Sequence, residues 1–97
     1  MILEFNKALR YLDIEKHDKA EDCLKKAIHI AKEENRNHEL MEIYCCYGEV
    51  LAMMERKDEA KKYLNEVIAF YKKTEECEYE YKIARGLLDE IEEDCMS

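Results

Sequence analysis

Histidine and cysteine are the residues of this chain best suited to bind a metal or to act as a nucleophile, but their spacing favours neither role. The three histidines fall in different segments, no Cys-x-x-Cys pair occurs, and Cys23 and His29 are six residues apart, on different faces of a helix. Cys45 and Cys46 are adjacent, and on a helix they would point about 100° apart, so a disulfide between them would distort the backbone. We therefore expect no metal site and no cofactor, and we expect reduced thiols, as in a cytoplasmic protein.

Carboxylates could form an acid and base pair, because the chain has 24 Asp and Glu residues against 16 Lys and Arg residues. Their positions, however, fall on the polar faces of expected helices, where charge mainly keeps a helix soluble. The sequence contains no Gly-rich phosphate loop and no nucleophile elbow. We expect no enzymatic activity, although a site made of scattered residues would leave no local signature.

The formal net charge of −8 also limits the partners. Phosphate binding needs a basic surface, so nucleic acid is not expected as a partner, and the same sign disfavours an anionic membrane surface. The apolar runs are too short to span a bilayer, and Glu4 interrupts the apolar residues that follow Met1, which argues against a signal peptide. We therefore expect a protein or peptide partner.

A set of five residues recurs forty positions apart and organises the rest of the chain. Small and branched residues four apart lie on one helical stripe, and Asp just before the stripe is suited to be an N-cap. Each copy is therefore expected to be one amphipathic helix. The matching residues are Asp18, Ala20, Leu24, Ile28 and Lys32, followed by Asp58, Ala60, Leu64, Ile68 and Lys72.

The composition favours an all-α fold in a single domain over residues 1–97. Pro is absent, Gly occurs twice, and 41% of the residues are charged. Gly48 and Gly86 fall in the middle of expected helices, where Gly is costly, and we interpret each as a place where another helix crosses closely. Five helices are predicted, at about Ile2–Glu15, Asp18–Glu34, Glu39–Arg56, Asp58–Lys73 and Tyr79–Asp94, with a turn at residues 35–38.

These residues resemble a tetratricopeptide repeat. In that family a large and then a small residue in the first helix are followed by an aromatic or aliphatic residue, and the second helix carries a small, a large and another small residue. One copy of this order is formed by Tyr47, Gly48, Leu51, Ala60, Leu64 and Val67, and the other by Ala8, Tyr11, Ala20, Leu24 and Ala27, with Lys7 in the place of the large residue. The repeat is longer than the usual length of about 34 residues and lacks the terminal Pro, in which it is similar to the repeats of Gram-positive peptide-pheromone regulators.

The resemblance implies a right-handed superhelix of two helix-turn-helix repeats, at about residues 1–37 and 38–76, and a terminal helix at about residues 79–94. It also implies that the first helix of each pair lines a concave face that binds a protein or a peptide. The basic residues that some relatives use to hold a terminal carboxylate are missing, and Glu42 and Glu49 would bias this face toward a neutral or basic ligand. The expected partner-binding residues are Ile2, Phe5, Asn6, Leu9, Leu12, Glu42, Cys45, Glu49, Met53, Ile83 and Leu87.

The first expected helix carries two apolar rows, and one of them has two interpretations. The row of Ile2, Phe5, Leu9 and Leu12 either meets a partner or turns inward and becomes core. Asn6 could bond a peptide backbone, or it could be an ordinary exposed residue near a helix start.

We expect a non-catalytic module that binds a protein segment or a peptide by burying apolar side chains. Two alternatives stay open. The same apolar row and the unpaired fifth helix could close against a second copy of the chain in a homodimer, or the chain could be a fragment of a larger regulator.

Overall fold

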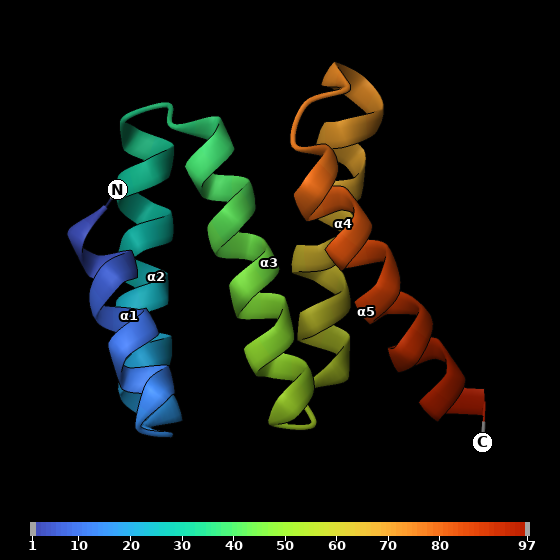
Figure 1. Ribbon diagram of the computed structural model, residues 1–97, viewed down its shortest axis with the longest axis horizontal. Helices are drawn as coiled ribbons and strands as arrows, with labels where there is room; N and C mark the ends of the chain where they lie inside the picture. Colours follow the sequence, from blue (N-terminus) through green and yellow to red (C-terminus); the bar gives the residue numbers. More distant parts are fainter. Residues whose placement is uncertain (1, 97) are drawn as a thin grey trace. The chain divides into compact units, whose positions relative to one another are not determined.

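The computed structural model describes residues 2–96, with the side chains of residues 2–93 (Figure 1). Met1 and Ser97, which the predicted domain includes, lie outside the described residues. The part of the chain that is described contains helices and no strand, so the all-α prediction is confirmed. The helices are α1 (Leu3–Asp13), α2 (His17–Glu33), α3 (Asn37–Met53), α4 (Lys57–Thr74) and α5 (Glu78–Met96).

The starts of α2 and α4 differ from the predicted ones, because aspartate is not the cap. Lys16 and Arg56 occupy the two N-cap positions, and within the described residues neither makes a side-chain capping bond. Asp18 and Asp58, which the sequence predicts as caps, lie inside the first turn of their helices. There their negative charge faces the positive end of the helix dipole. The capping prediction is wrong, although the helices it marks are present.

The turns after α1, α2 and α3 share one backbone geometry at intervals of twenty residues. Glu15, Asn35 and Glu55 each adopt a left-handed conformation, with φ of 58°, 55° and 62°. The amide of the following residue donates to the carbonyl five positions back, which ends each helix in a Schellman motif. Because α3 already begins at Asn37, only the first half of the predicted turn at residues 35–38 is a turn. The three hydrogen bonds join Lys16 N to Tyr11 O at 2.9 Å, Arg36 N to Ala31 O at 2.9 Å, and Arg56 N to Leu51 O at 2.8 Å.

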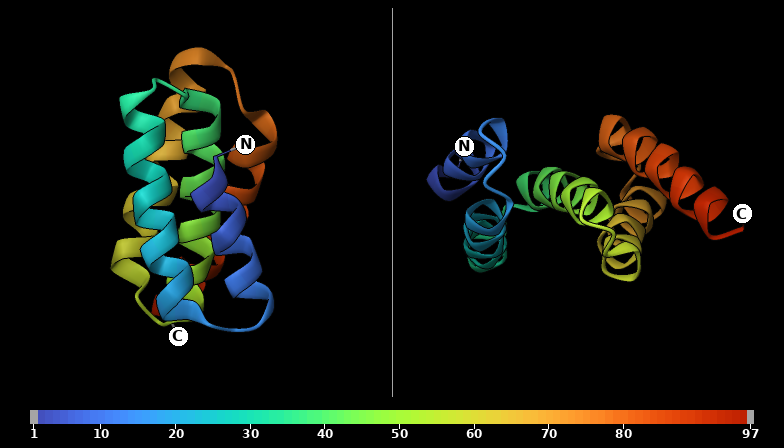
Figure 2. Two further views of the ribbon diagram at one scale, coloured as in Figure 1. Left: turned by 90° about the vertical axis from the view of Figure 1, so that its left-hand side faces the viewer. Right: turned by 90° about the horizontal axis from the view of Figure 1, so that it is seen from below.

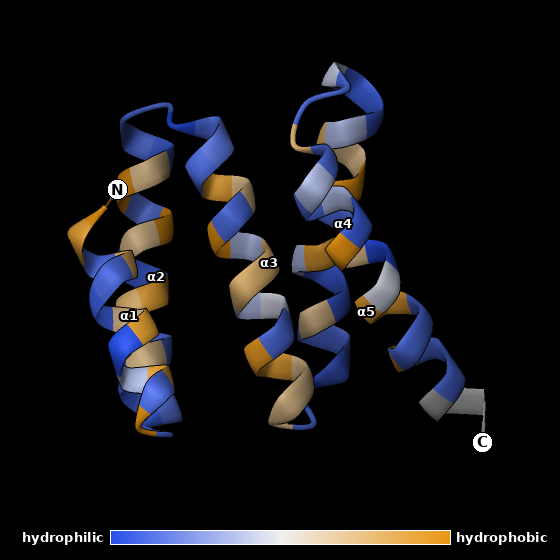
Figure 3. Cartoon of the chain, viewed as in Figure 1, coloured by the Kyte–Doolittle hydropathy of each residue, from blue (hydrophilic) through white to orange (hydrophobic). Residues whose placement is uncertain are grey.

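The described residues form two compact units, which divide between Ile43 and Tyr44 inside α3. In the first unit α1 packs antiparallel against α2 (Figure 2). Figure 3 shows apolar and polar residues alternating along α2, as expected for a helix with one face in a core. Small residues on both helices let them approach closely, and the fully buried ones are Ala8, Ala20, Ala27 and Ala31.

The first unit also holds the start of α1 in place through a carboxylate. Glu39, in the first turn of α3, accepts a hydrogen bond from the backbone amide of Ile2 at 3.1 Å. The other oxygen of Glu39 accepts a bond from Arg36 at 3.3 Å. This carboxylate satisfies an amide near the N-terminus of α1 that the helix itself leaves unpaired.

The second unit contains the rest of α3 together with α4 and α5. A Cβ atom at Gly48 would lie 2.6 Å from Cδ2 of Leu64, so the missing side chain allows α3 and α4 to cross closely, as predicted. A stacked ring pair, Tyr71 and Tyr81 with centroids 4.2 Å apart, joins α4 to α5. At Gly86, by contrast, an added Cβ would meet no atom of the described residues within 4 Å. The predicted close crossing at Gly86 is therefore wrong.

Candidate binding site

The predicted apolar row on α1 is divided between core and surface. Ile2 and Phe5 are only 4% and 6% exposed, so their side chains belong to the core of the chain. Leu9 and Leu12 are half-buried, and Asn6 is exposed. The burial of Ile2 and Phe5 counts against direct contact with a ligand and agrees with the inward-facing interpretation of this part of the row.

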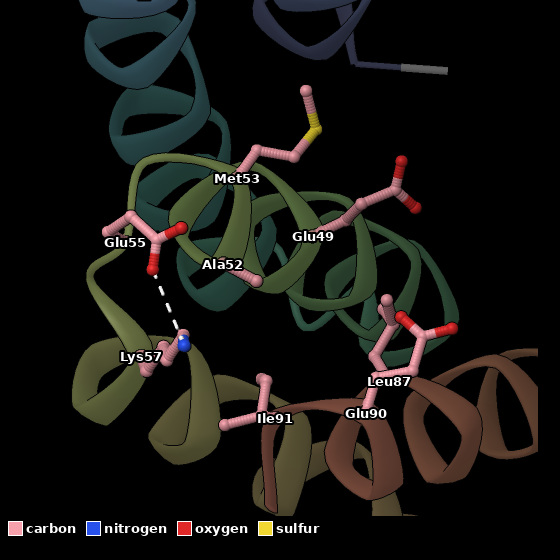
Figure 4. A pocket seen from close by; sticks show the side chains of 8 residues that line it. All are labelled: Glu49, Ala52, Met53, Glu55, Lys57, Leu87, Glu90 and Ile91. Carbon is pink, nitrogen blue, oxygen red and sulfur yellow. Dashed lines mark ion pairs between the residues drawn. The ribbon is translucent and has the colours of Figure 1, made fainter. Parts of the chain in front are cut away.

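Three of the other predicted residues come together in the second unit. Glu49 and Met53 on α3 and Leu87 on α5 line one hollow with a volume of about 340 Å³ (Figure 4). Its remaining lining residues are Ala52, Glu55, Lys57, Glu90 and Ile91.

The floor of this hollow is apolar. Ile91 is buried, and Ala52 and Leu87 are half-buried. Met53 stands at the rim with 61% of its surface exposed, although it is a large apolar side chain. An unbranched thioether is flexible and polarisable, so it can adapt to ligands of different shape. The arrangement can bury an apolar side chain of another molecule.

The charged groups of the hollow are separated between its two ends. Figure 4 shows Glu49 and Glu90 at one end, and the ion pair of Lys57 with Glu55 at the other. The Lys57 Nζ and Glu55 Oε2 atoms are 3.4 Å apart, so these two charges largely compensate each other. Glu49 and Glu90 are exposed, and neither forms an ion pair with any described residue. The end formed by these two glutamates is therefore negatively charged.

Cys45, another predicted contact residue, connects α3 and α5, the two helices on either side of the hollow. Its thiol is buried and donates a hydrogen bond to the backbone carbonyl of Glu80 on α5 at 3.2 Å. Burial, followed by the nearby Glu80 charge, raises the pKa of Cys45 to about 12. Burial, followed by the charge of Glu49, raises the pKa of Cys46 to about 11. Both thiols are protonated at neutral pH and are poor nucleophiles.

Eight of the eleven predicted residues do not line the hollow, namely the five between Ile2 and Leu12 together with Cys45, Glu42 and Ile83. Ile83 is half-buried on α5, and Glu42 is exposed in the first unit. Conversely, the prediction missed Ala52, Glu55, Lys57, Glu90 and Ile91. A sequence signal exists for three of them, because residues three and four positions apart share a helix face. Ala52 follows Glu49 by three positions, and Glu90 and Ile91 follow Leu87 by three and four.

The part of the chain that the structure describes contains no group of three or more His, Cys, Asp or Glu side chains placed to hold a metal ion. None of its helices combines the length and the apolar character needed to cross a membrane. Cys23, Cys45, Cys46 and Cys77 are not joined in disulfides.

Comparison with known protein families identifies the repeat. The sequence model of the tetratricopeptide repeat matches residues 1–73, which is most of the chain. The chain belongs to the tetratricopeptide repeat family. Repeats of this family generally mediate protein–protein interactions. The comparisons with curated proteins and with solved structures give no match, and the similarity to Gram-positive peptide-pheromone regulators stays a prediction.

The tetratricopeptide-repeat match spans α1 to α4 and leaves α5 outside. Within it, almost all the positions that carry the family pattern are buried, which explains why they recur. Lys7 is an exception, because its side chain is about half exposed and pairs with Glu4 at 3.6 Å. The buried pattern residues are Ala8, Ala20, Leu24 and Ala27 in one repeat, and Tyr47, Gly48, Leu51, Ala60, Leu64 and Val67 in the other.

Proposed function

We propose that this tetratricopeptide-repeat chain is a non-catalytic module that binds a peptide or an unfolded protein segment in the hollow between α3 and α5. The observation that carries the proposal is Met53, a large apolar side chain left exposed at the rim of a hollow with an apolar floor. Exposed apolar surface beside a concave region is typical of a binding site.

The volume of the hollow supports a short contact. About 340 Å³ is at the low end of the range for small-molecule pockets, so the hollow has space for one or two large side chains. A segment that buries them there would gain affinity from apolar burial, and its main chain would extend over the surface.

Binding of labelled peptides tests the proposal. The probes are fluorescein-labelled peptides that carry Leu, Met or Phe at a central position in an otherwise Gly- and Ser-rich sequence, and fluorescence polarisation measures their Kd. Met53→Asp places a charge at the rim, and we expect it to weaken binding by at least about tenfold, because burial of the anchor side chain would be lost. Leu3→Asp is the matched control, because Leu3 is 66% exposed on α1 and is not one of the residues that line the hollow.

Two results would overturn the proposal. The first is equal binding by the wild type and Met53→Asp, with circular dichroism showing that both are folded. The second is a tight homodimer in sedimentation equilibrium that Met53→Asp dissociates, which would mean that a second copy of the chain covers the hollow. Placement of the protein in the cytoplasm also stays a proposal, and microscopy of a tagged full-length protein would test it.

A further inference from the structure

The two ends of the hollow differ in charge, and the proposed apolar contact does not depend on this difference. Glu49 on α3 and Glu90 on α5 extend to the same end (Figure 4), and neither has an ion-pair partner among the described residues. The one lysine of the lining, Lys57, is at the opposite end and is paired with Glu55. The apolar residues Ala52 and Ile91 lie between these ends. Along the hollow, a ligand therefore meets the negative end first, then the apolar floor, and then the end where the charges of Lys57 and Glu55 compensate each other.

We propose that the ligand of this hollow is a protein segment in which a Lys or Arg stands close to a large apolar residue. The apolar side chain enters the hollow over Ala52 and Ile91, and the cationic group lies between the carboxylates of Glu49 and Glu90. This inference rests on the proposed function, and it specifies which segments the hollow selects.

Charge complementarity supports this occupant over a neutral or an acidic one. A cation placed between Glu49 and Glu90 interacts favourably with both carboxylates. An acidic segment would add a further negative charge to a chain whose formal net charge is already −8. Because both carboxylates are exposed, each contact is expected to change Kd by only about two- to fivefold. Selectivity therefore comes from the two glutamates together with the apolar anchor.

Three matched peptides test the inference. They share one central Leu and one Gly- and Ser-rich background, and the positions beside the Leu are Lys, Gln or Glu. Fluorescence polarisation at low salt should give the tightest binding for the Lys peptide, and added NaCl should weaken that peptide the most. The double variant Glu49→Gln/Glu90→Gln should weaken the Lys peptide by about tenfold and change the Kd of the Gln peptide by less than about twofold.

The control variant is Glu66→Gln/Glu92→Gln, which removes the same charge from exposed positions on α4 and α5 that do not line the hollow. The net charge of the two double variants is equal. The control therefore distinguishes the effect of a local contact with Glu49 and Glu90 from the effect of the electrostatic field of the whole chain. An equal loss of Lys-peptide affinity in both would overturn the inference.

The remaining outcomes separate this inference from the proposed function. If the Gln and Lys peptides bind equally, and Met53→Asp weakens both, the basic selectivity is wrong and the binding site stands. If none of the three peptides binds the wild type, both proposals are overturned. Tightest binding by the Glu peptide would contradict the inference directly.

Discussion

At the scale of single residues, the size of the side chain at position 48 determines how closely α3 approaches α4. Leu64 is fully buried and its Cγ and Cδ2 atoms would lie 2.8 Å and 2.6 Å from an added Cβ. Contacts this short require Leu64 to move, and a side chain packed on all sides has little space to do so. The position therefore requires glycine in spite of its cost in a helix.

Alanine substitutions at the two glycines should have opposite effects on stability. In Gly48→Ala, the strain of overpacking should exceed the gain of about 1 kcal/mol in helix propensity, so the free energy of unfolding should fall by about 1–2 kcal/mol. In Gly86→Ala, the space around the new methyl group is open and the free energy of unfolding should rise by about 0.5–1 kcal/mol. Urea unfolding followed by circular dichroism measures both. Stabilisation by Gly48→Ala would show that the crossing is not tight.

A second prediction concerns Glu15, whose backbone is left-handed with φ of 58°. This conformation costs an ordinary residue about 1–2 kcal/mol and costs glycine almost nothing, although glycine also loses more entropy on folding. Glu15→Gly should therefore raise the free energy of unfolding by about 0.5–1 kcal/mol in urea unfolding. Asn35→Gly is the control, because asparagine tolerates this conformation and should gain much less. Equal gains at both positions would contradict the explanation.

At the scale of elements, the hydrogen bond from the Cys45 thiol to the carbonyl of Glu80 connects α3 to α5. The bond needs the proton on sulfur, so it exists only while the thiol is protonated. Burial raises the pKa of Cys45 to about 12, compared with 9.0 in the unfolded chain. The folded state therefore favours the protonated thiol. This contribution to stability is complete below about pH 9 and is lost as the pH rises toward 12.

Alkaline unfolding should thus depend on Cys45. Between about pH 8 and pH 10.5 the wild type should lose stability, and on the order of 2 kcal/mol of this loss should come from Cys45. Cys45→Ala should be less stable than the wild type at pH 8, because a buried side chain becomes smaller, and should lose less on going to pH 10.5. Urea unfolding at the two pH values measures the difference. Equal losses in the two proteins would show that this thiol does not couple the helices to pH.

The helices themselves could be predicted from the sequence, because the spacing of residues such as Ala20, Leu24 and Ile28 is set by burial and burial repeats with the helical period. The residues that cap the helices could not. The chain ends α1 and α3 at left-handed glutamates, Glu15 and Glu55, where the usual residue signal would be glycine. Aspartates near a helix start are compatible with a cap or with the first turn, and the sequence does not separate the two.

The candidate site could be predicted in part. Glu49, Met53 and Leu87 were identified through the family resemblance, whereas Glu90 was missed because its proximity to Glu49 depends on how α5 packs beside α3. The connection between α4 and α5, which precedes that packing, differs in length from the three connections before it. Helices α2, α3 and α4 begin at residues 17, 37 and 57, but α5 begins at residue 78, one residue later than this spacing.

At the scale of the whole molecule, each unit of the array buries its own core. Leu24 in the first unit and Leu64 in the second occupy equivalent positions forty residues apart, and both are fully buried. In such arrays stability is approximately the sum of the stabilities of the units and of the interfaces between neighbours. The interior is thus divided between the units, whereas the excess of negative charge is a property of the entire chain.

The last prediction follows from that charge. The formal net charge of −8 on 97 residues produces self-repulsion, which is larger in the compact folded state than in the expanded unfolded one. The opposing surface ion pairs, such as Lys82 with Glu78, are exposed and contribute little. Raising NaCl from about 20 mM to about 500 mM shortens the screening length from roughly 20 Å to about 4 Å, so repulsion should weaken more than attraction does. The free energy of unfolding should therefore rise by about 1 kcal/mol in urea titrations at the two salt concentrations, and a fall would show that the ion pairs outweigh the net charge.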